Sequence, residues 1–213
     1  MSSKGLLVVM TGPSGTGKSS VVAELLAAEP GLRFSVSHTT RPPRPAEREG
    51  HDYRFVTPAQ FERIRAANGF VEWAVVHGHM YGTSHAEIEG TIRQGAEVLL
   101  DIDVQGAGQV AARFPDAVSV FILPPDYATL EARLRGRRTE DAGDLALRLR
   151  TANAEVRHYT SFRYVVVNVS LSAAAAEIRS ILAAERACTD RRREEAEKII
   201  ATFPRGGGRN EGT

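Results

Sequence analysis

The segment Gly12-Pro13-Ser14-Gly15-Thr16-Gly17-Lys18-Ser19 restricts the fold of this chain more than any other part of its sequence. It follows a compact apolar run at 6–10 and precedes a helix-compatible stretch at 18–28. Glycines in such a loop let successive backbone N–H groups turn inward, and the following helix adds the positive end of its dipole. A strand, a glycine-rich loop and a helix in this order are typical of a site that binds nucleotide phosphates.

The side chains of this loop suit the same chemistry. Lys18 can reach the β- and γ-phosphates of ATP, and the hydroxyl of Ser19 is a ligand for Mg²⁺. The alternative is an ordinary strand–helix turn with an exposed lysine, which the full match and its flanking elements disfavour. GTPases, ATPases, helicases and small-molecule kinases all share the loop, so it predicts nucleotide binding and leaves the reaction open.

Apolar strands alternate with helical stretches along the rest of the chain. Buried strands are predicted at 97–102, 118–123 and 164–169, and helices at about 107–113, 126–136, 143–157 and 173–187. This alternation is typical of a parallel sheet covered on both faces. The sequence therefore predicts an α/β fold, a P-loop NTPase-type parallel sheet flanked by helices.

Two segments interrupt the alternation and divide the chain. Residues 37–90 carry short strand-like pieces between turn residues, which predicts a small β-rich insertion. The core then comprises 1–36 and 91–190, with a short helical, arginine-rich lid at about 133–150. Residues 191–213 are charged and then glycine-rich, which predicts a charged, disordered tail that starts as a solvated helix.

Composition narrows the class of partner. The 27 Lys and Arg residues nearly balance the 26 Asp and Glu residues, and a net charge of +1 argues against a general binder of nucleic acid or anionic membranes. Cys188 is the sole cysteine of the sequence, which excludes an internal disulfide. The sequence has no apolar run of membrane-spanning length and no signal-peptide pattern, so we expect a soluble, cytoplasmic protein. The oligomeric state stays open.

Two carboxylates follow a predicted buried strand. Asp101 and Asp103 close the run 97–103, and alternation along a strand would put them on the same side. Ligands of open α/β sheets bind outside the carboxyl ends of the strands, so one of the two could hold the water shell of a Mg²⁺ ion. The alternative, in which a carboxylate only caps the next loop, fits one of them better than both.

Arginines form two groups. Arg41 and Arg44 flank Pro42-Pro43, a stiff segment that would hold two guanidinium groups in a fixed relation. Two separate groups beside a phosphate loop predict two phosphorylated substrates, because phosphoryl transfer needs charge neutralised on both donor and acceptor. Each arginine by itself is more often a solvated surface residue. The second group lies in the lid and comprises Arg133, Arg137, Arg138 and Arg148.

Longer motifs resemble the guanylate kinases, a family that transfers the γ-phosphoryl group of ATP to GMP. The resemblance runs from about residue 5 to residue 182 and implies a reaction of MgATP with GMP, and also dGMP, that yields ADP and GDP for purine nucleotide recycling. The motifs that carry it, in chain order, are Ser35-Val36-Ser37-His38-Thr39-Thr40-Arg41-Pro42-Pro43-Arg44, Gly50-His51-Asp52-Tyr53-Arg54-Phe55-Val56, Phe70-Val71-Glu72-Trp73-Ala74, Tyr81-Gly82-Thr83, Leu100-Asp101-Ile102-Asp103-Val104-Gln105-Gly106 and Leu134-Arg135-Gly136-Arg137-Arg138-Thr139-Glu140.

The resemblance also implies residue roles. Arg41, Arg44, Tyr53 and Tyr81 would bind the GMP phosphate, whereas Ser37, Glu72, Thr83 and Asp103 would contact the guanine. Lys18, Arg41, Arg44, Arg133, Arg137 and Arg148 would be the catalytic set, with Arg137 also on ATP, while Ser19 and Asp101 would serve the Mg²⁺ ion.

Base chemistry supports the assignment of one of these residues. Guanine presents two adjacent donors, N1–H and the N2 amino group, that suit a carboxylate such as Glu72, whereas adenine would turn a lone pair toward it. The alternative for Glu72 is a polar residue on the exposed face of a strand.

Two other functions stay open. One is a P-loop kinase for another small phosphorylated acceptor, which the intact set Ser37, Glu72 and Tyr81 disfavours. The other is a guanylate-kinase-like module that binds protein ligands without catalysis. The complete phosphate loop disfavours that reading, because such modules typically carry a damaged loop.

Overall fold

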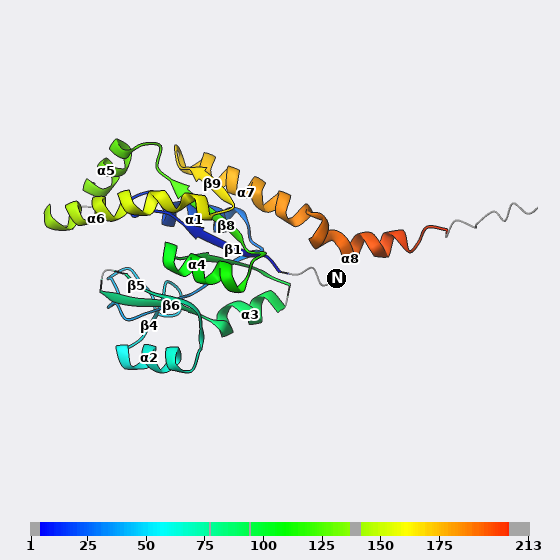
Figure 1. Cartoon of the computed structure of the whole chain (residues 1–213), viewed down its shortest axis with the longest axis horizontal. Helices are drawn as coiled ribbons and strands as arrows, with labels where there is room; N and C mark the ends of the chain where they lie inside the picture. Colours follow the sequence, from blue (N-terminus) through cyan, green and yellow to red (C-terminus); the bar gives the residue numbers. More distant parts are fainter. Residues whose placement is uncertain (1–4, 77, 94, 137–141, 205–213) are drawn as a thin grey trace, which may run out of the picture.

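The centre of the molecule is a parallel β-sheet flanked by helices, in a computed structural model that describes residues 5–76, 78–93, 95–136 and 142–204. The predicted α/β fold is therefore confirmed (Figure 1). The strands, in their order across the sheet, are β2 (Leu32–Phe34), β7 (Glu97–Asp101), β1 (Leu7–Thr11), β8 (Val118–Leu123) and β9 (Tyr164–Val167).

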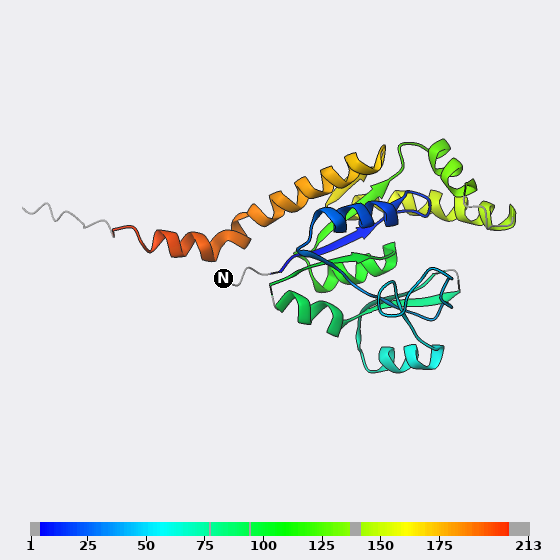
Figure 2. The same cartoon turned by 180° about the vertical axis from the view of Figure 1, so that it is seen from behind.

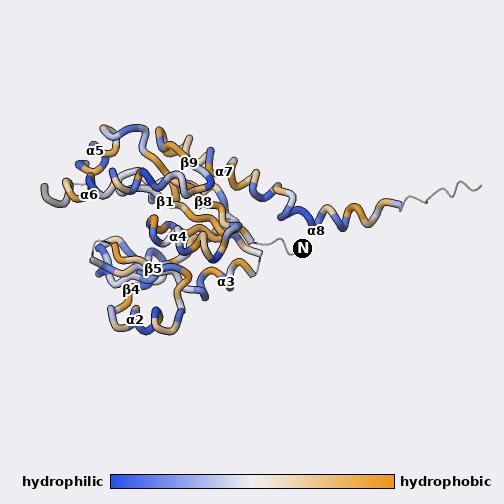
Figure 3. The backbone as a smooth tube through the Cα atoms, viewed as in Figure 1, coloured by the Kyte–Doolittle hydropathy of each residue, from blue (hydrophilic) through white to orange (hydrophobic). Residues whose placement is uncertain are grey.

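Strand β1 is a central strand that is buried on both faces. Val8 and Met10 face a cluster built with α1 (Lys18–Ala28) and α7 (Leu171–Ala187). Val9 belongs to the opposite cluster, which includes residues of α3 (His85–Arg93) and α4 (Val104–Arg113). Burial on both faces explains the uninterrupted apolar run, and Figure 3 shows hydrophobic residues along β1 and β8. The loop after β1 therefore emerges in the middle of the carboxyl edge of the sheet.

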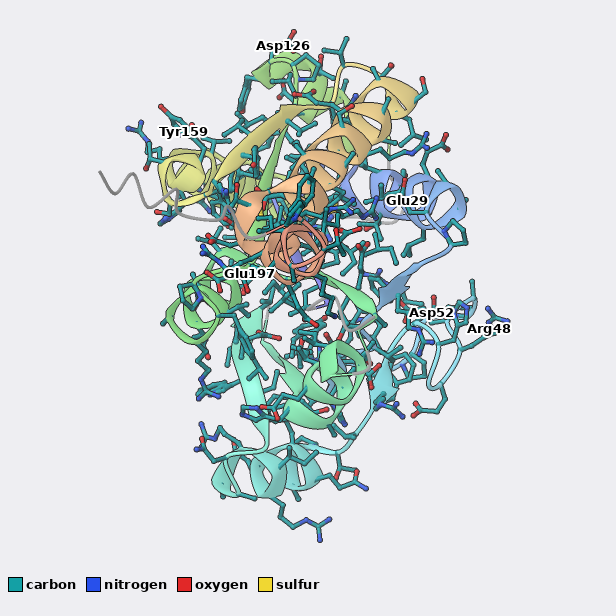
Figure 4. The ribbon with its side chains drawn as sticks, turned by 90° about the vertical axis from the view of Figure 1, so that its right-hand side faces the viewer. Glu29, Arg48, Asp52, Asp126, Tyr159 and Glu197 are labelled. Carbon is teal, nitrogen blue, oxygen red and sulfur yellow. The ribbon has the colours of Figure 1, made fainter. Side chains whose placement is uncertain are left out.

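Ion pairs attach α7 to the sheet and to the end of α1. Glu29, labelled in Figure 4, accepts hydrogen bonds from Arg179 Nε at 2.9 Å and from Arg186 Nη2 at 2.9 Å. Arg186 also pairs with Glu97 at 2.6 Å, at the start of β7. A network of partly buried pairs fixes a helix better than isolated surface pairs do.

A second, mixed sheet is built from residues 38–84, inside the segment set apart as an insertion. Its helix α2 (Pro58–Ala66) starts with a capping box between Thr57 and Gln60 and packs the fully buried ring of Phe61 against Phe70, with centroids 4.5 Å apart. The strands, in their order across this sheet, are β4 (Arg54–Phe55), β3 (His38–Thr39), β6 (His79–Ser84) and β5 (Phe70–Val76).

Helix α4 links the two sheets. The side-chain amide of Gln109 exchanges hydrogen bonds with the backbone of Trp73 on β5, at 2.7 and 3.2 Å. Arg113, at the end of the same helix, donates to the carbonyl of Phe70 at 3.1 Å. The small sheet thus contacts the core through β5 along α4, as the lower half of Figure 1 shows.

A pair of helices next to β8 and β9 corresponds to the predicted lid. Helix α5 (Tyr127–Arg135) and helix α6 (Ala142–Glu155) share a small apolar cluster that includes Leu130, Leu134 and Ala152. A 3₁₀ segment, Val156–Ser161, follows α6 directly. In Figure 2 these helices lie at the end of the molecule away from α8.

The placement of Asp103 corrects one prediction. Strand β7 ends at Asp101, so Asp101 and Asp103 do not lie side by side on one strand. Asp103 is instead the N-cap of α4, because its carboxylate accepts a hydrogen bond from the backbone N–H of Gly106 at 2.8 Å. The helix consequently begins at Val104, three residues before the predicted start.

Four elements were not predicted, namely β2, α2, β6 and α3. Strand β2 has three residues at the edge of the sheet, and β6 contains Gly82, which resembles a turn residue in the sequence. Helix α3 buries Ile88 between polar neighbours, a weak periodic signal. For α2 a readable signal existed, since Thr57, Pro58 and Gln60 form a standard helix start.

The charged segment at the end of the chain starts with a helix, as predicted. Helix α8 (Thr189–Ile200) projects away from the body (Figure 2). Pairs at helical spacing support it, Asp190 with Arg193 at 2.8 Å and Glu194 with Lys198 at 2.5 Å among them. None of its residues is buried, as expected for a solvated helix, and residues 205–213 lie outside the described residues. None of the helices described combines the length and the apolar character needed to cross a membrane.

We predict that removal of residues 189–213 changes the unfolding midpoint by no more than about 2 °C, because exposed pairs of this kind contribute about 0.5 kcal/mol or less each. Differential scanning calorimetry measures the effect. Leu182→Ala, which truncates a fully buried residue of α7, is the control and should cost about 2–5 kcal/mol. A midpoint drop in the truncated chain as large as in the control would show that α8 is part of the folded core.

Candidate functional site

A crevice of about 290 Å³ lies between the carboxyl edge of the parallel sheet, the small sheet and α6. Most of the predicted site residues line it. Thr83 and Arg133 are not among the lining residues, and Arg137 lies outside the described residues. The predicted residues that line the crevice are Gly12 to Ser19, Ser37, Arg41, Arg44, Tyr53, Glu72, Tyr81, Asp101, Asp103 and Arg148.

The phosphate loop adopts the conformation that its glycines predict. Gly15 and Gly17 have φ values of 89° and 85°, a region that other residues rarely occupy. The Thr16 hydroxyl donates to the carbonyl of Pro13 at 3.0 Å and closes the turn from inside. Helix α1 starts directly after Gly17, so its unpaired N–H groups and the positive end of its dipole face the crevice.

Lys18 forms an ion pair with Asp101, and both side chains are largely buried. Burial lowers the pKa of Lys18 to about 8, although the charges of Asp103 and Glu155 act in the opposite direction. Burial therefore disfavours the charged form of this ammonium group, and an anion bound beside it would favour that form. Ser19 follows at the start of α1, so a hydroxyl and a carboxylate, both hard oxygen ligands, lie next to this lysine.

Arg41 is held in place from several sides. Its guanidinium donates to both oxygens of Glu47, at 2.7 and 2.9 Å, and its Nε donates to the Tyr81 hydroxyl at 3.2 Å. It also lies over the ring of Tyr53, 5.4 Å from the centroid. Arg44 has a side chain that is 68% exposed, and its backbone N–H donates to Glu47 at 2.8 Å. Arg41 is thus held by short hydrogen bonds, whereas the guanidinium of Arg44 is largely exposed and lies 3.9 Å from Glu47.

Glu72 is a buried carboxylate, with 3% of its surface exposed. Its Oε1 accepts a hydrogen bond from the Thr83 hydroxyl at 2.5 Å, and that hydroxyl lies 3.0 Å from the hydroxyl of Ser37. Thr83 does not line the crevice, but it orients the carboxylate that does. The alternative of an exposed strand residue is therefore wrong for Glu72.

The environment of Glu72 disfavours its charge. Burial raises the pKa of Glu72 to about 7, the hydrogen bond from Thr83 lowers it, and the nearby charge of Asp103 raises it further. Further hydrogen bonds to this carboxylate would favour its charged form. A ligand with adjacent N–H groups can donate such bonds.

Arg133 contacts the phosphate loop through backbone carbonyl groups. Its guanidinium donates to the carbonyl of Thr16 at 3.0 Å and to that of Asn168 at 3.1 Å. The side chain of Asn168 donates to the same Thr16 carbonyl at 2.7 Å. These bonds brace the loop against the end of β9, whereas a contact of Arg133 with a transferring phosphoryl group stays a prediction.

Helix α6 contributes a residue that the sequence analysis missed. Glu155 lines the crevice and accepts a hydrogen bond from the backbone N–H of Ser14, inside the phosphate loop. Burial and the charge of Asp103 raise its pKa. Arg148, Thr151 and Glu155 are spaced by three and four residues and line the same crevice, so helical periodicity starting from Arg148 would have found it.

Comparisons with known proteins agree with this geometry. A family model described as guanylate kinase matches residues 4–185. A guanylate kinase of Symbiobacterium thermophilum is 48% identical over 188 residues, covering 88% of this chain and 89% of the relative. One of Syntrophotalea carbinolica is 44% identical and covers 94% and 95%. A crystal structure of guanylate kinase from Anaplasma phagocytophilum superposes with a TM-score of 0.80 at 33% identity, covering 95% and 97%.

We predict that the burial of Glu72 costs stability in a pH-dependent way. Its pKa is about 7 in the folded chain against a usual 4.5, so the folded state binds the extra proton between these values. The free energy of unfolding should fall by up to about 3 kcal/mol as the pH rises from 4.5 through 7. Glu72→Gln cannot titrate, and its stability relative to the original chain should rise over the same interval. Urea unfolding of both chains at pH 5 and pH 8 measures the difference between their free energies of unfolding. An equal difference at the two pH values would contradict the raised pKa of Glu72.

Proposed function

The chain belongs to the guanylate kinase family, enzymes that transfer phosphate from ATP to GMP, and we propose that its crevice carries out this transfer with the residues described above. One observation carries the residue-level proposal. The phosphate loop of the core and the Arg41–Tyr81 cluster of the small sheet line the same crevice, so two anion sites face one space. A phosphoryl donor and a phosphorylated acceptor need such a pair.

GMP would bind against the small sheet. Arg41, already oriented by Glu47, and the exposed side chain of Arg44 would bind its phosphate together with the hydroxyls of Tyr53 and Tyr81. Glu72 would accept the N1–H and N2–H groups of guanine, which supply the donors that its buried carboxylate lacks. Ser37, Thr83 and Asp103 would complete the base site.

ATP would bind on the core side. Backbone N–H groups of the loop and the ammonium of Lys18 would hold its phosphates, while Lys18 exchanges its partner Asp101 for them. Asp101, once released, and Ser19 offer the oxygen ligands that suit Mg²⁺, which when bound would neutralise phosphate charge. The buried Oδ1 of Asn168 has no partner among the residues described and is an acceptor suited to the amino group of adenine.

The transfer itself would need positioning more than proton chemistry. The acceptor oxygen of GMP is already an anion, so no strong general base is required, and the main obstacle is repulsion between two polyanions. Arg41, Arg44 and Arg148 would reduce it, with Arg133 and Arg137 of the lid in support. Closure of the insertion and the lid would exclude the water that otherwise hydrolyses ATP. The products would be ADP and GDP, which is consistent with a role in purine nucleotide recycling.

The test of this function is ADP release with MgATP and each of GMP, dGMP, AMP and UMP, or no acceptor. Release that depends on GMP and falls by roughly 10⁴-fold with AMP is expected, because a site with buried polar groups rejects a mispaired base. Equal release with AMP or UMP would overturn the guanine assignment. Binding of GMP without any turnover would favour a non-catalytic binding module.

We predict different defects for the two cationic ends of the crevice. Lys18→Ala should lower kcat by roughly 10²-fold or more and leave GMP binding intact. Arg44→Ala should weaken GMP binding and leave ATP binding intact. Arg48→Ala is the matched control, because Arg48 is exposed on the same segment and Figure 4 shows it at the outer edge. Steady-state kinetics with calorimetric binding separates the cases, and wild-type rates in either variant would refute the role of that residue.

A further inference from the structure

The first turn of α4 approaches the buried carboxylate of Glu72 very closely. A Cβ atom placed on Gly106 would lie 2.5 Å from Glu72 Oε2 and 3.2 Å from its Cδ. Separations under 3.0 Å do not occur at real Cβ atoms, so position 106 has room for hydrogen and for no carbon. Gly106 also donates its N–H to Asp103, the cap of the helix, at 2.8 Å.

The Glu72 carboxylate has little freedom to move away from this helix. On its other side Oε1 is bonded to the Thr83 hydroxyl at 2.5 Å, and the side chain is buried. A carbon at position 106 would therefore displace the carboxylate and lengthen that hydrogen bond. The carboxylate lies between Thr83 of β6 on one side and the first turn of α4 on the other, so both elements fix its position.

We propose that Gly106 is a specificity-determining positioning residue. Because it has no side chain, Glu72 can lie against the first turn of α4, in the position from which it would contact the guanine. The inference rests on the proposed function and names a residue that contacts no substrate. The positive end of the α4 dipole supports the arrangement, because it offsets part of the repulsion between Glu72 and the capping carboxylate Asp103. The glycine would thus bring two acceptors, Glu72 from the small sheet and Asp103 from the cap of α4, to the donor edge of one base.

The substitution Gly106→Ala tests this role, and α4 offers a matched control. Gly108 lies on the same helix two residues later, is exposed, and has no atom within 4 Å of a Cβ placed on it among the residues described. Alanine favours helix at both positions, so neither variant should lose thermal stability through propensity. We expect Gly106→Ala to raise the KM for GMP at least tenfold and to leave the KM for ATP within twofold. Gly108→Ala should leave both values unchanged.

A double-mutant cycle separates positioning from general damage. Glu72→Asp shortens the side chain by one methylene and withdraws the carboxylate from position 106, so adding Gly106→Ala in that background should change the KM for GMP less than twofold. Equal KM values for GMP in Gly106→Ala and Gly108→Ala would overturn the inference. A parallel rise in the KM for ATP, or an equal rise in both backgrounds, would overturn it as well. Absence of GMP-dependent turnover in the unsubstituted enzyme would instead refute the proposed function.

Discussion

Charge neutralisation inside the crevice is the interaction on which the rest of the structure depends. Lys18 pairs with Asp101 on the core, and Arg41 pairs with Glu47 on the small sheet, so one cation on each side of the crevice has a carboxylate partner. The two pairs differ in what a ligand would change. Lys18 lies next to the loop N–H groups and can exchange its partner for phosphate, whereas Arg41 keeps a bidentate partner that orients it. Exchange suits a donor whose charge shifts during the reaction, and a fixed guanidinium suits an acceptor that must be held still.

The burial of Glu72 lowers the stability of the folded chain. A carboxylate with a pKa near 7 is less stable in the fold than a neutral side chain of the same shape would be, and the hydrogen bond from Thr83 repays a part of that cost. In the proposed function the N–H groups of guanine would offset the rest of the desolvation cost of Glu72, which would contribute to the affinity for the correct base. A base without these donors would leave the carboxylate buried and unpaired, which is the physical origin of selectivity. Loss of stability and, in the proposed function, selection of the base would therefore both result from the burial of Glu72.

Local patterns were sufficient for the loop and the central strands, because the glycines of 12–17 and the uninterrupted apolar run of β1 each have one strong structural interpretation. Local patterns were insufficient where a tertiary contact determines the position or the burial of a residue. Asp103 reads equally well as a strand end or a cap, and the bond to Gly106 makes it a cap. The burial of Glu72 was not visible in its own neighbours, and its assignment came from the family resemblance. Glu155 was missed although its spacing from Arg148 was legible, since a lone acid on a charged helix is usually solvated.

Helix α4 connects the carboxyl edge of the core sheet to the small sheet. It starts at Val104, three residues after β7 ends at Asp101, with Asp103 as its cap. Along the helix, Gly106 closely approaches Glu72, and Gln109 bonds to the backbone of β5. The proposed guanine site would consequently straddle the core and the small sheet, with one acidic side chain from each. A base bound there contacts both bodies at once, so correct base recognition would also hold the small sheet, with its arginines, against the core that carries the phosphate loop. Discrimination between bases and alignment of the two phosphate sites would then share one structural cause.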